Sequence, residues 1–415
     1  MKKIASDPKS SRNAKQSAFY SIFSMGSSSE FLSFGLEQKR FTQAGAYAPQ
    51  WHSTVLRQLV DVAKTRSVKP DSKLTSALGN LLQSDSPTIR KSAIQLAGLW
   101  GTRGLADQIR KIAENPTEPH SLRSAALEAA VQLMGAVDSE WIYKYAVDGN
   151  NIDLRASAIM AIVKTSTPRS IDLAVDLLVS PDHASAVSAG VIEDIMIRIL
   201  DQENGGLLLA SALQANKIEA LRSRFLLKIF FSTGRTSPEL YTTLNKAAGG
   251  SSIVPEFQPQ YLKDLAAETN ATGDEKIGEL IFSNLSCQSC HRLGENGAAI
   301  GPSLAAVGTT LSIERIAEEI LWPNRQVKEG YTVIQVLTKN GLIRQGYQRR
   351  SRESERQGNV VMQDIQSREL IRIHKNDIEA KKTSGSNMPS GLTNQLNRKQ
   401  LVDLLKFLSV QGQQN

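Results

Sequence analysis

Ile89-Arg90-Lys91-Ser92-Ala93 is the first of three similar segments, and the others are Leu122-Arg123-Ser124-Ala125-Ala126 and Leu154-Arg155-Ala156-Ser157-Ala158. Their arginines are 33 and 32 residues apart. Each segment follows a turn-prone stretch and opens an apolar run with helical periodicity. A repeat of this length predicts stacked pairs of helices, because one pair cannot bury its apolar face alone.

The helical pattern extends over residues 51–248. Two degenerate units fit at about 181–212 and 213–248, and the last contains Arg222 and Arg224. The units loosely resemble HEAT repeats, in which a Pro or Asp turn precedes an Arg that opens the second helix. This resemblance implies an α-solenoid that offers a protein docking surface. A non-repetitive helical bundle is the alternative interpretation.

Two segments flank the repeats. Residues 1–50 are rich in Ser, Gly, Lys and Gln and have weak periodicity, so we expect an irregular lead-in. Residues 249–270 contain Gly249-Gly250-Ser251-Ser252 and the two prolines Pro255 and Pro259. These residues break helices, so a linker is predicted there.

Composition excludes several classes of protein. The chain has 415 residues, of which 40% are hydrophobic, so two or three domains with real cores are expected. The net charge of +8 is spread out, and the densest basic stretch, 348–356, is interrupted by acidic residues and lacks aromatics. We interpret it as a solvated loop and expect no nucleic-acid partner. No apolar run is long enough to predict a transmembrane segment, and residues 4–18 are too polar for a signal peptide.

The carboxyl-terminal part, 271–415, contains Cys287-Gln288-Ser289-Cys290-His291. Its two cysteines are the only ones in the chain and lie too close together for a structural disulfide. In a Cys-x-x-Cys-His motif, the two thiols add to the two vinyl groups of a haem, and the adjacent imidazole ligates the iron. The motif therefore predicts one covalent haem c, anchored by Cys287 and Cys290, with His291 as proximal ligand.

Two other chemistries fit the motif less well. A thioredoxin-like dithiol follows a strand and opens a helix, whereas here a helical pattern at 274–286 precedes the motif and a Gly-rich loop follows it. A zinc site needs further Cys or His ligands at suitable spacing, and the remaining histidines are scattered.

The second axial ligand is expected to be Met388. It lies in the loop Gly385–Leu392 between Gly and Pro residues, shortly before the last helix. Met362 belongs to a strand pattern, where a methionine is typical of a core. His374, which would give a bis-His site, and an open or water-bound position are the alternatives.

Secondary structure in this part is mixed. Helices are predicted at 274–286, 312–321 and 398–410. Between them, a small antiparallel sheet is predicted as an insertion at about 331–378, with strands at 331–337, 342–347, 359–365 and 370–373. The pair Asn340-Gly341 is a strong hairpin turn between the first two strands.

Residues 273–412 resemble the haem-binding domain of planctomycete-type c-type cytochromes. Beyond the Cys287–His291 motif, the matching segments are Gly301–Leu304, Ile320–Asn324, Gly341–Gly346, Ser386–Leu392 and Leu401–Leu408. The resemblance implies that the Pro302 carbonyl supports His291. It also implies that the first and last helices cross, with Gly278 and Phe282 meeting Leu404 and Phe407. The fold expected is mainly α: a HEAT-like α-solenoid, then an all-α cytochrome c domain with a small inserted antiparallel β-sheet.

The expected function is that of a single-haem electron carrier that receives electrons from a dehydrogenase partner. A haem peroxidase or ligand sensor with an open distal site, and a scaffold whose helical repeats are the functional part, are the alternatives. No nucleophile–base constellation indicates catalytic residues. Proteins of the resembling type often carry a β-propeller dehydrogenase domain ahead of their repeats, so the resemblance predicts an electron-carrier module of such a dehydrogenase–cytochrome protein.

Attachment of haem c normally takes place outside the cytoplasm. A periplasmic or otherwise extracytoplasmic location is therefore expected, and it requires that the chain be part of a longer exported protein. A cytoplasmic protein that never receives haem is the alternative.

Overall fold

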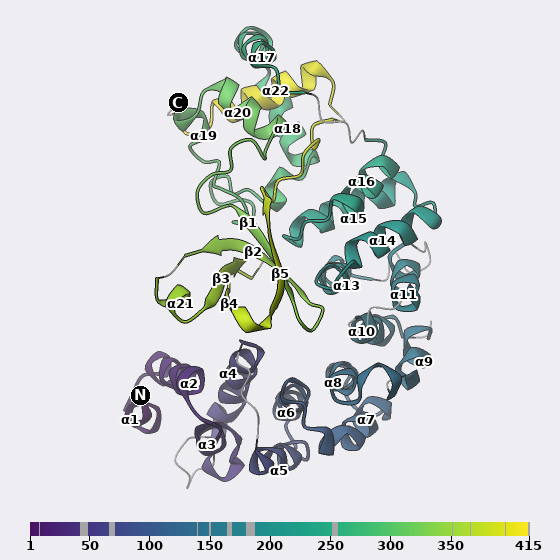
Figure 1. Ribbon diagram of the computed structural model, residues 1–415, viewed down its shortest axis with the longest axis vertical. Coiled ribbons are helices and arrows are strands. Elements are labelled where there is room, and N and C mark those ends of the chain that lie inside the picture. The colour runs from purple at the N-terminus through teal and green to yellow at the C-terminus, as the bar shows by residue number, and fades with distance from the viewer. Residues whose placement is uncertain are drawn as a thin grey trace. The chain divides into compact units, whose positions relative to one another are not determined.

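The structure is a computed structural model, in which the chain is mainly helical with one small antiparallel sheet of five strands (Figure 1). It describes residues 1–7, 9–41, 49–65, 71–138, 140–148, 151–163, 168–179, 187–250, 256–350, 352–365, 367–394 and 396–413. The chain divides into two compact units, Met1–Leu173 and Ala174–Asn415. The segment 51–248, predicted as one run of repeats, is therefore divided between the two units.

The first unit begins with helices, so the prediction of an irregular lead-in over 1–50 is wrong for the described part. α2 (Arg12–Met25) starts after Ser11, whose hydroxyl accepts a hydrogen bond from a backbone N–H of the first turn. Its Phe19 and Phe23 are buried, and the helix packs on α4 (His52–Thr65). The apolar face consists of a few aromatics among serines, so the periodicity was too weak to predict it. The other short helices here are α1 (Lys2–Ser6), α3 (Ser28–Phe31), η1 (Leu32–Leu36) and η2 (Gln38–Arg40).

Helices in the predicted repeats pack against their neighbours along the chain. α6 contacts α4, α5 and α8, and α8 contacts α7 and α10. Their bounds are α5 (Ser72–Leu81), α6 (Pro87–Trp100), α7 (Ala106–Glu114), α8 (His120–Asp138), α9 (Tyr143–Ala146) and α10 (Ile152–Ile162). Residues 149 and 150, which belong to the turn-prone stretch before the third arginine segment, lie outside the described residues.

The recurring arginines have one structural role. Each donates a hydrogen bond from Nε to a carbonyl at the end of the preceding helix, 3.0–3.1 Å away. The pairs are Arg90 with Leu82, Arg123 with Ala113, and Arg155 with Ala146. The last carbonyls of a helix have no partner within it, so the motif caps one helix of each pair from the next. Capping therefore explains the arginine period that is visible in the sequence.

The second unit continues with helices of the same kind. They are the end of α11 (Pro168–Val179), α13 (Ala189–Leu200), α14 (Gly205–Ala215), α15 (Ala220–Ser232) and α16 (Pro238–Ala247). Arg222 donates to the Leu178 carbonyl and Arg224 to the Ala248 carbonyl, so both arginines of the last predicted unit also cap helix ends. Residues 180–186, where the unit predicted at 181–212 begins, lie outside the described residues.

The prediction of a linker over 249–270 is wrong from Pro259 onward, and residues 251–255 lie outside the described part. α17 (Pro259–Thr272) begins with Pro at its first turn, where the missing N–H costs no hydrogen bond. Its Leu262 and Leu265 are buried against α20 and α22. Proline here starts a helix instead of breaking one.

The predicted helices of the carboxyl-terminal part are present. They are α18 (Glu275–Asn284), α20 (Ile313–Leu321) and α22 (Arg398–Ser409), with the short α19 (Val307–Thr310) between the first two. α18 crosses α22 at Gly278, where an added Cβ would come within 2.1 Å of the Asp403 carbonyl oxygen. Beside this contact the rings of Phe282 and Phe407 lie with centroids 5.4 Å apart. The crossing that the resemblance implied at Gly278, Phe282 and Phe407 is therefore found.

The sheet has the strand order β4-β3-β2-β1-β5, with all neighbours antiparallel. Its strands are β1 (Val333–Thr338), β2 (Ile343–Arg349), β3 (Asn359–Asp364), β4 (Leu370–His374) and β5 (Ile378–Gly385). Four of them lie within two residues of the prediction. β5 was not predicted, because its residues are mostly polar and exposed and lack a strand pattern. It pairs with β1 and extends the sheet past residue 378.

The basic stretch 348–356 is not a plain loop. It contains the end of β2 and the short helix α21 (Arg352–Arg356), and residue 351 lies outside the described part.

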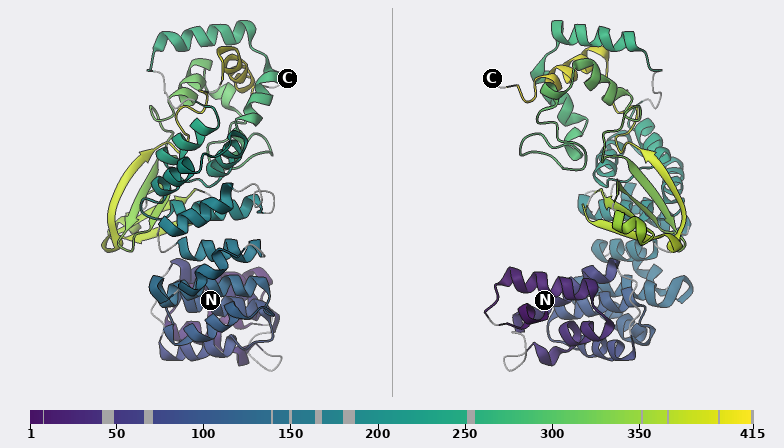
Figure 2. Two further views of the ribbon diagram at one scale, coloured as in Figure 1. Left: turned by 90° about the vertical axis from the view of Figure 1, so that its right-hand side faces the viewer. Right: turned by 60° about the vertical axis from the view of Figure 1, so that its left-hand side comes forward.

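Buried polar contacts attach the sheet to the helices before it in the second unit, beside which it lies in both further views (Figure 2). Arg235, which follows α15, pairs through Nε with Asp201 at 2.7 Å and through Nη1 with Asp364 of β3 at 3.1 Å. The backbone N–H of Ile343 donates to the Asp201 carbonyl at 2.7 Å. α13, α15 and the sheet therefore form one structure beside the Cys287–His291 segment.

Candidate functional site

The cysteine segment forms a tight turn directly after α18. Ser286 has a left-handed backbone (φ 60°), which ends the helix, and Cys287–Ser289 form one turn of 3-10 helix (η7). The His291 N–H donates to the Cys287 carbonyl at 2.9 Å. Both thiols are free and half-buried. The local backbone therefore gathers the two thiols and the imidazole on one turn.

His291 is oriented by the loop that follows. Its Nδ1 lies 2.8 Å from the Pro302 carbonyl oxygen, which only accepts hydrogen bonds, so Nδ1 carries the proton and donates. Nε2 is then the nitrogen with a free lone pair. Gly301 lies against the ring, and a Cβ there would be 2.7 Å from Cε1. The contact with Pro302 that the resemblance implied is present.

Burial sets the protonation of all three groups. It lowers the pKa of His291, so the imidazole is neutral near pH 7 and able to act as a ligand. Burial raises the pKa of the Cys290 thiol to about 12, and burial together with the neighbouring Cys290 raises the pKa of the Cys287 thiol to about 12. A reactive dithiol needs a lowered thiol pKa, so these values argue against the thioredoxin-like alternative.

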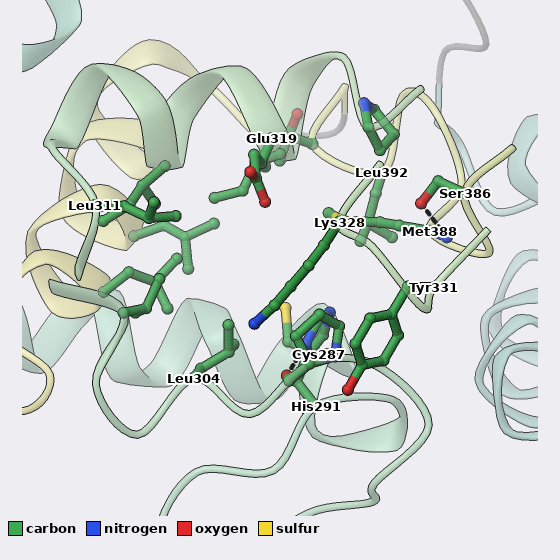
Figure 3. Close-up of a pocket in the computed structure, with 18 of the residues that line it drawn as sticks. Cys287, His291, Leu304, Leu311, Glu319, Lys328, Tyr331, Ser386, Met388 and Leu392 are labelled. Atoms are coloured by element: carbon green, nitrogen blue, oxygen red, sulfur yellow. Dashed lines mark hydrogen bonds between the residues drawn. The ribbon is translucent and has the colours of Figure 1, made fainter. Parts of the chain in front are cut away.

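Cys287, His291 and Met388 line one cavity, which we call the main cavity (Figure 3). In Figure 3 the Met388 side chain enters it across from the His291 ring. The rest of the lining is largely apolar and includes Phe282, Leu285, Leu304, Val307, Leu311, Ile316, Ile320, Leu392, Leu404 and Leu408. The sequence predicted helices for Leu285, Ile316, Ile320, Leu404 and Leu408 and a loop for Leu392, but only the packing of these segments brings them around one space.

The Met388 loop is held in place by its own backbone contacts. The Met388 N–H donates to the Ser386 hydroxyl at 3.1 Å, and the Ser386 N–H donates to Asn324 Oδ1 at 2.8 Å. Asn324 follows α20 and precedes the sheet in the sequence, whereas Ser386 follows the sheet. Segments from before and after the inserted sheet therefore position the methionine together.

The two alternative ligands lie elsewhere. Met362 is fully buried in the sheet with Ile334 and Val336, as its strand pattern predicts. His374 accepts a hydrogen bond at Nδ1 from the Asn376 N–H at the end of β4. Neither residue lines the main cavity.

Two charged residues line the main cavity although no sequence pattern predicted them there. Glu319 of α20 points into it, and the Lys328 side chain stretches across it (Figure 3). Glu319 is paired with Arg315 at 2.9 Å. No motif surrounds either residue, so only the structure places them at the site.

α15 also contributes to the site. The Cys290 thiol lies 3.6 Å from the Phe231 carbonyl oxygen, and Phe231 lines a smaller cavity that adjoins the main one. Tyr347 of β2 lines the same space and donates to the Ile300 carbonyl at 2.8 Å. A helix of the predicted repeats and a strand of the insertion thus form the wall beside Cys290, an arrangement that the sequence did not predict.

The residues present fit a covalent haem. Two thiols lie on one turn, and the imidazole has one nitrogen held by a carbonyl and the other free. The Met388 thioether shares an apolar cavity with Cys287 and this imidazole. No protein-family model and no curated protein matches the chain. Within the described residues, no three side chains of the Cys, His, Asp or Glu type are grouped to hold a metal ion. The described helices are also too short or too polar to cross a membrane.

Proposed function

We propose that the chain is a c-type cytochrome that carries electrons with a single haem. Cys287 and Cys290 would anchor the haem through thioethers, and His291 and Met388 would ligate its iron. The observation that carries this proposal is the hydrogen bond from His291 Nδ1 to Pro302, which leaves Nε2 free beside a cavity that Met388 also lines.

The protein's contribution is to orient ligands and exclude water. The Pro302 carbonyl selects the His291 tautomer and makes Nε2 a better donor to a metal. The loop contacts of Ser386 and Asn324 hold Met388, and the apolar side chains keep the cavity dry. Bound there, a haem supplies an iron that alternates between Fe(II) and Fe(III), and a thioether ligand favours Fe(II).

We further propose a fold for each part of the chain, a redox partner and a cellular location. The repeated arginine caps support a HEAT-like solenoid, and the crossing of α18 and α22 beside the motif supports a cytochrome c domain. The solenoid would dock a redox partner, a dehydrogenase in our proposal, and the net charge of +8 would favour an acidic partner surface. Covalent haem attachment would place the protein in the periplasm or another extracytoplasmic space.

One spectrum tests the proposal. The full chain, exported and produced with a haem c maturation system, should give a pyridine haemochrome of the c type. Cys287→Ser should weaken covalent retention of the haem, because only one thioether remains. Met362→Leu, a change in the sheet core away from the cavity, is the matched control and should retain the haem.

A colourless product that contains zinc would contradict the proposal. Rapid binding of carbon monoxide by the reduced wild-type protein would instead favour the alternative of an open distal site, because a bound Met388 must leave first.

A further inference from the structure

Lys328 brings a positive charge into the main cavity. It lies in the segment between α20 and β1, and its side chain stretches across the cavity in Figure 3. Among the described residues that line the main cavity and the smaller cavity next to it, Lys328 is the only Lys or Arg. A negative charge bound in this space therefore has one cationic side chain available to it.

The backbone fixes where this side chain begins. The Tyr331 N–H donates to the Lys328 carbonyl at 3.0 Å, which closes a turn. Gly330 in the turn has a left-handed backbone (φ 81°), and its carbonyl accepts a hydrogen bond from Arg349 Nη1 of β2 at 2.7 Å. The turn is thus attached to the sheet, and both Lys328 and Tyr331 line the main cavity from it.

The acidic side chain of the main cavity is already paired. Glu319 pairs with Arg315 at 2.9 Å. Glu318 pairs with the same arginine at 3.1 Å and with Arg325 at 2.9 Å, so two carboxylates are matched by two guanidinium groups. Lys328 is exposed and forms no ion pair with a described residue. One unmatched positive charge therefore remains in the lining of the cavity.

An apolar cavity with one unmatched cation fits an apolar molecule that carries a carboxylate. Haem has this chemistry, because its flat apolar ring bears two propionate groups. A carboxylate in a largely apolar site is stabilised by a cationic hydrogen-bond donor. Lysine suits this task, since its ammonium is a point charge on a flexible stem that can follow the carboxylate.

We propose that Lys328 binds a carboxylate of the macrocycle held in the main cavity, which for haem is one of the two propionates. This inference rests on the proposed haem function. It gives a binding role to a residue outside both the Cys287–His291 motif and the loop that carries Met388.

The experiment uses the full chain, produced without haem maturation, and mesoporphyrin IX as the probe. This porphyrin has both propionates but no iron, and ethyl groups replace the vinyl groups. The two thiols therefore cannot attach to it, and no metal ligand contributes to its affinity. Its dimethyl ester, dissolved in the same cosolvent, has the same ring without the two charges. Titration by porphyrin fluorescence measures each dissociation constant.

Lys328→Gln should weaken binding of the free diacid about fivefold, as expected for the loss of one exposed ion pair. Binding of the dimethyl ester should be equal in the wild type and this variant, because the ester forms no ion pair. Lys328→Arg should restore binding of the diacid. Lys339→Gln is the matched control, since it removes the same charge from an exposed turn outside both cavities, and it should change neither dissociation constant.

Equal binding of the diacid by the wild type and Lys328→Gln would overturn the inference. So would an absence of porphyrin binding by the wild type. An equal loss for the diacid and the ester would also overturn it, because the lysine would then act through the shape of the cavity. Circular dichroism establishes that each variant is folded.

These outcomes are separate from those of the electron-carrier test, which depends on covalent attachment of haem c. A chain that receives haem c but shows no effect of Lys328→Gln on the diacid loses only the present inference. A chain that binds the diacid through Lys328 but never receives haem c loses only the electron-carrier proposal.

Discussion

The Nδ1 atom of His291 lies 2.8 Å from the carbonyl oxygen of Pro302. Gly301 lies against the ring, and a Cβ built on this residue would be only 2.7 Å from Cε1 of His291. The proposed proximal ligand is thus oriented by backbone, and no acidic side chain takes part in this contact.

Gly301→Ala should disturb haem ligation but not haem attachment. The added methyl group overlaps the imidazole, so the ring must turn and the hydrogen bond to Pro302 is weakened. We expect a shifted Soret band and an altered reduction potential, with the haem still covalently bound on a denaturing gel. Gly190→Ala is the control, because a Cβ at Gly190 meets nothing within 4 Å. Identical spectra for Gly301→Ala and wild type would contradict the proposed role of His291.

Met388→His should lower the reduction potential of the haem protein. Replacing a thioether ligand by imidazole removes the preference for Fe(II). Potentiometric titration measures the change. Met362→Leu is the matched control, since Met362 is buried in the sheet and a swap of similar volume is well tolerated there. If both variants keep the wild-type potential, Met388 is not a ligand.

Arg235→Met should destabilise the protein by about 3–5 kcal/mol, because it removes the buried guanidinium that pairs with the carboxylates of both Asp201 and Asp364. Urea denaturation followed by circular dichroism measures this loss. Arg169→Met, which removes an exposed pair with Glu140, should cost about 1 kcal/mol or less. Similar small losses in both variants would show that the sheet is not anchored through Arg235.

The first unit should lose stability between about pH 6.5 and pH 4. His52 is buried, its Nε2 lies 3.2 Å from the Gly35 carbonyl oxygen, and burial lowers its pKa from 6.5 to about 4. Between these pH values, His52 is protonated in the unfolded chain but neutral in the folded chain. The stabilisation present above pH 6.5 is therefore lost as the pH falls to 4. The loss amounts to roughly 3 kcal/mol.

Thermal unfolding at several pH values measures this dependence. His52→Gln keeps a donor for Gly35 and does not titrate, so its stability should change less over the same range. An equally steep pH dependence in this variant would mean that other groups cause the loss.

Local sequence determined much of this protein. The three arginine segments predicted the paired helices, and the hairpin turn at Asn340-Gly341 with its alternating flanks predicted β1 and β2 to within two residues. These features depend on periodicity and on neighbours within one turn or one hairpin, which the order of residues contains. The motif at Cys287–His291 predicted the chemistry for the same reason, since its three reactive groups lie on one turn.

Tertiary structure alone decided which distant residues meet. Met388 is 97 residues beyond His291 in the sequence, and it reaches the main cavity because the chain returns along β5 next to β1. Phe231 reaches Cys290 because Arg235 attaches the sheet to the helices before it. Such meetings depend on burial and pairing between segments far apart in the chain, which no local pattern of residues expresses.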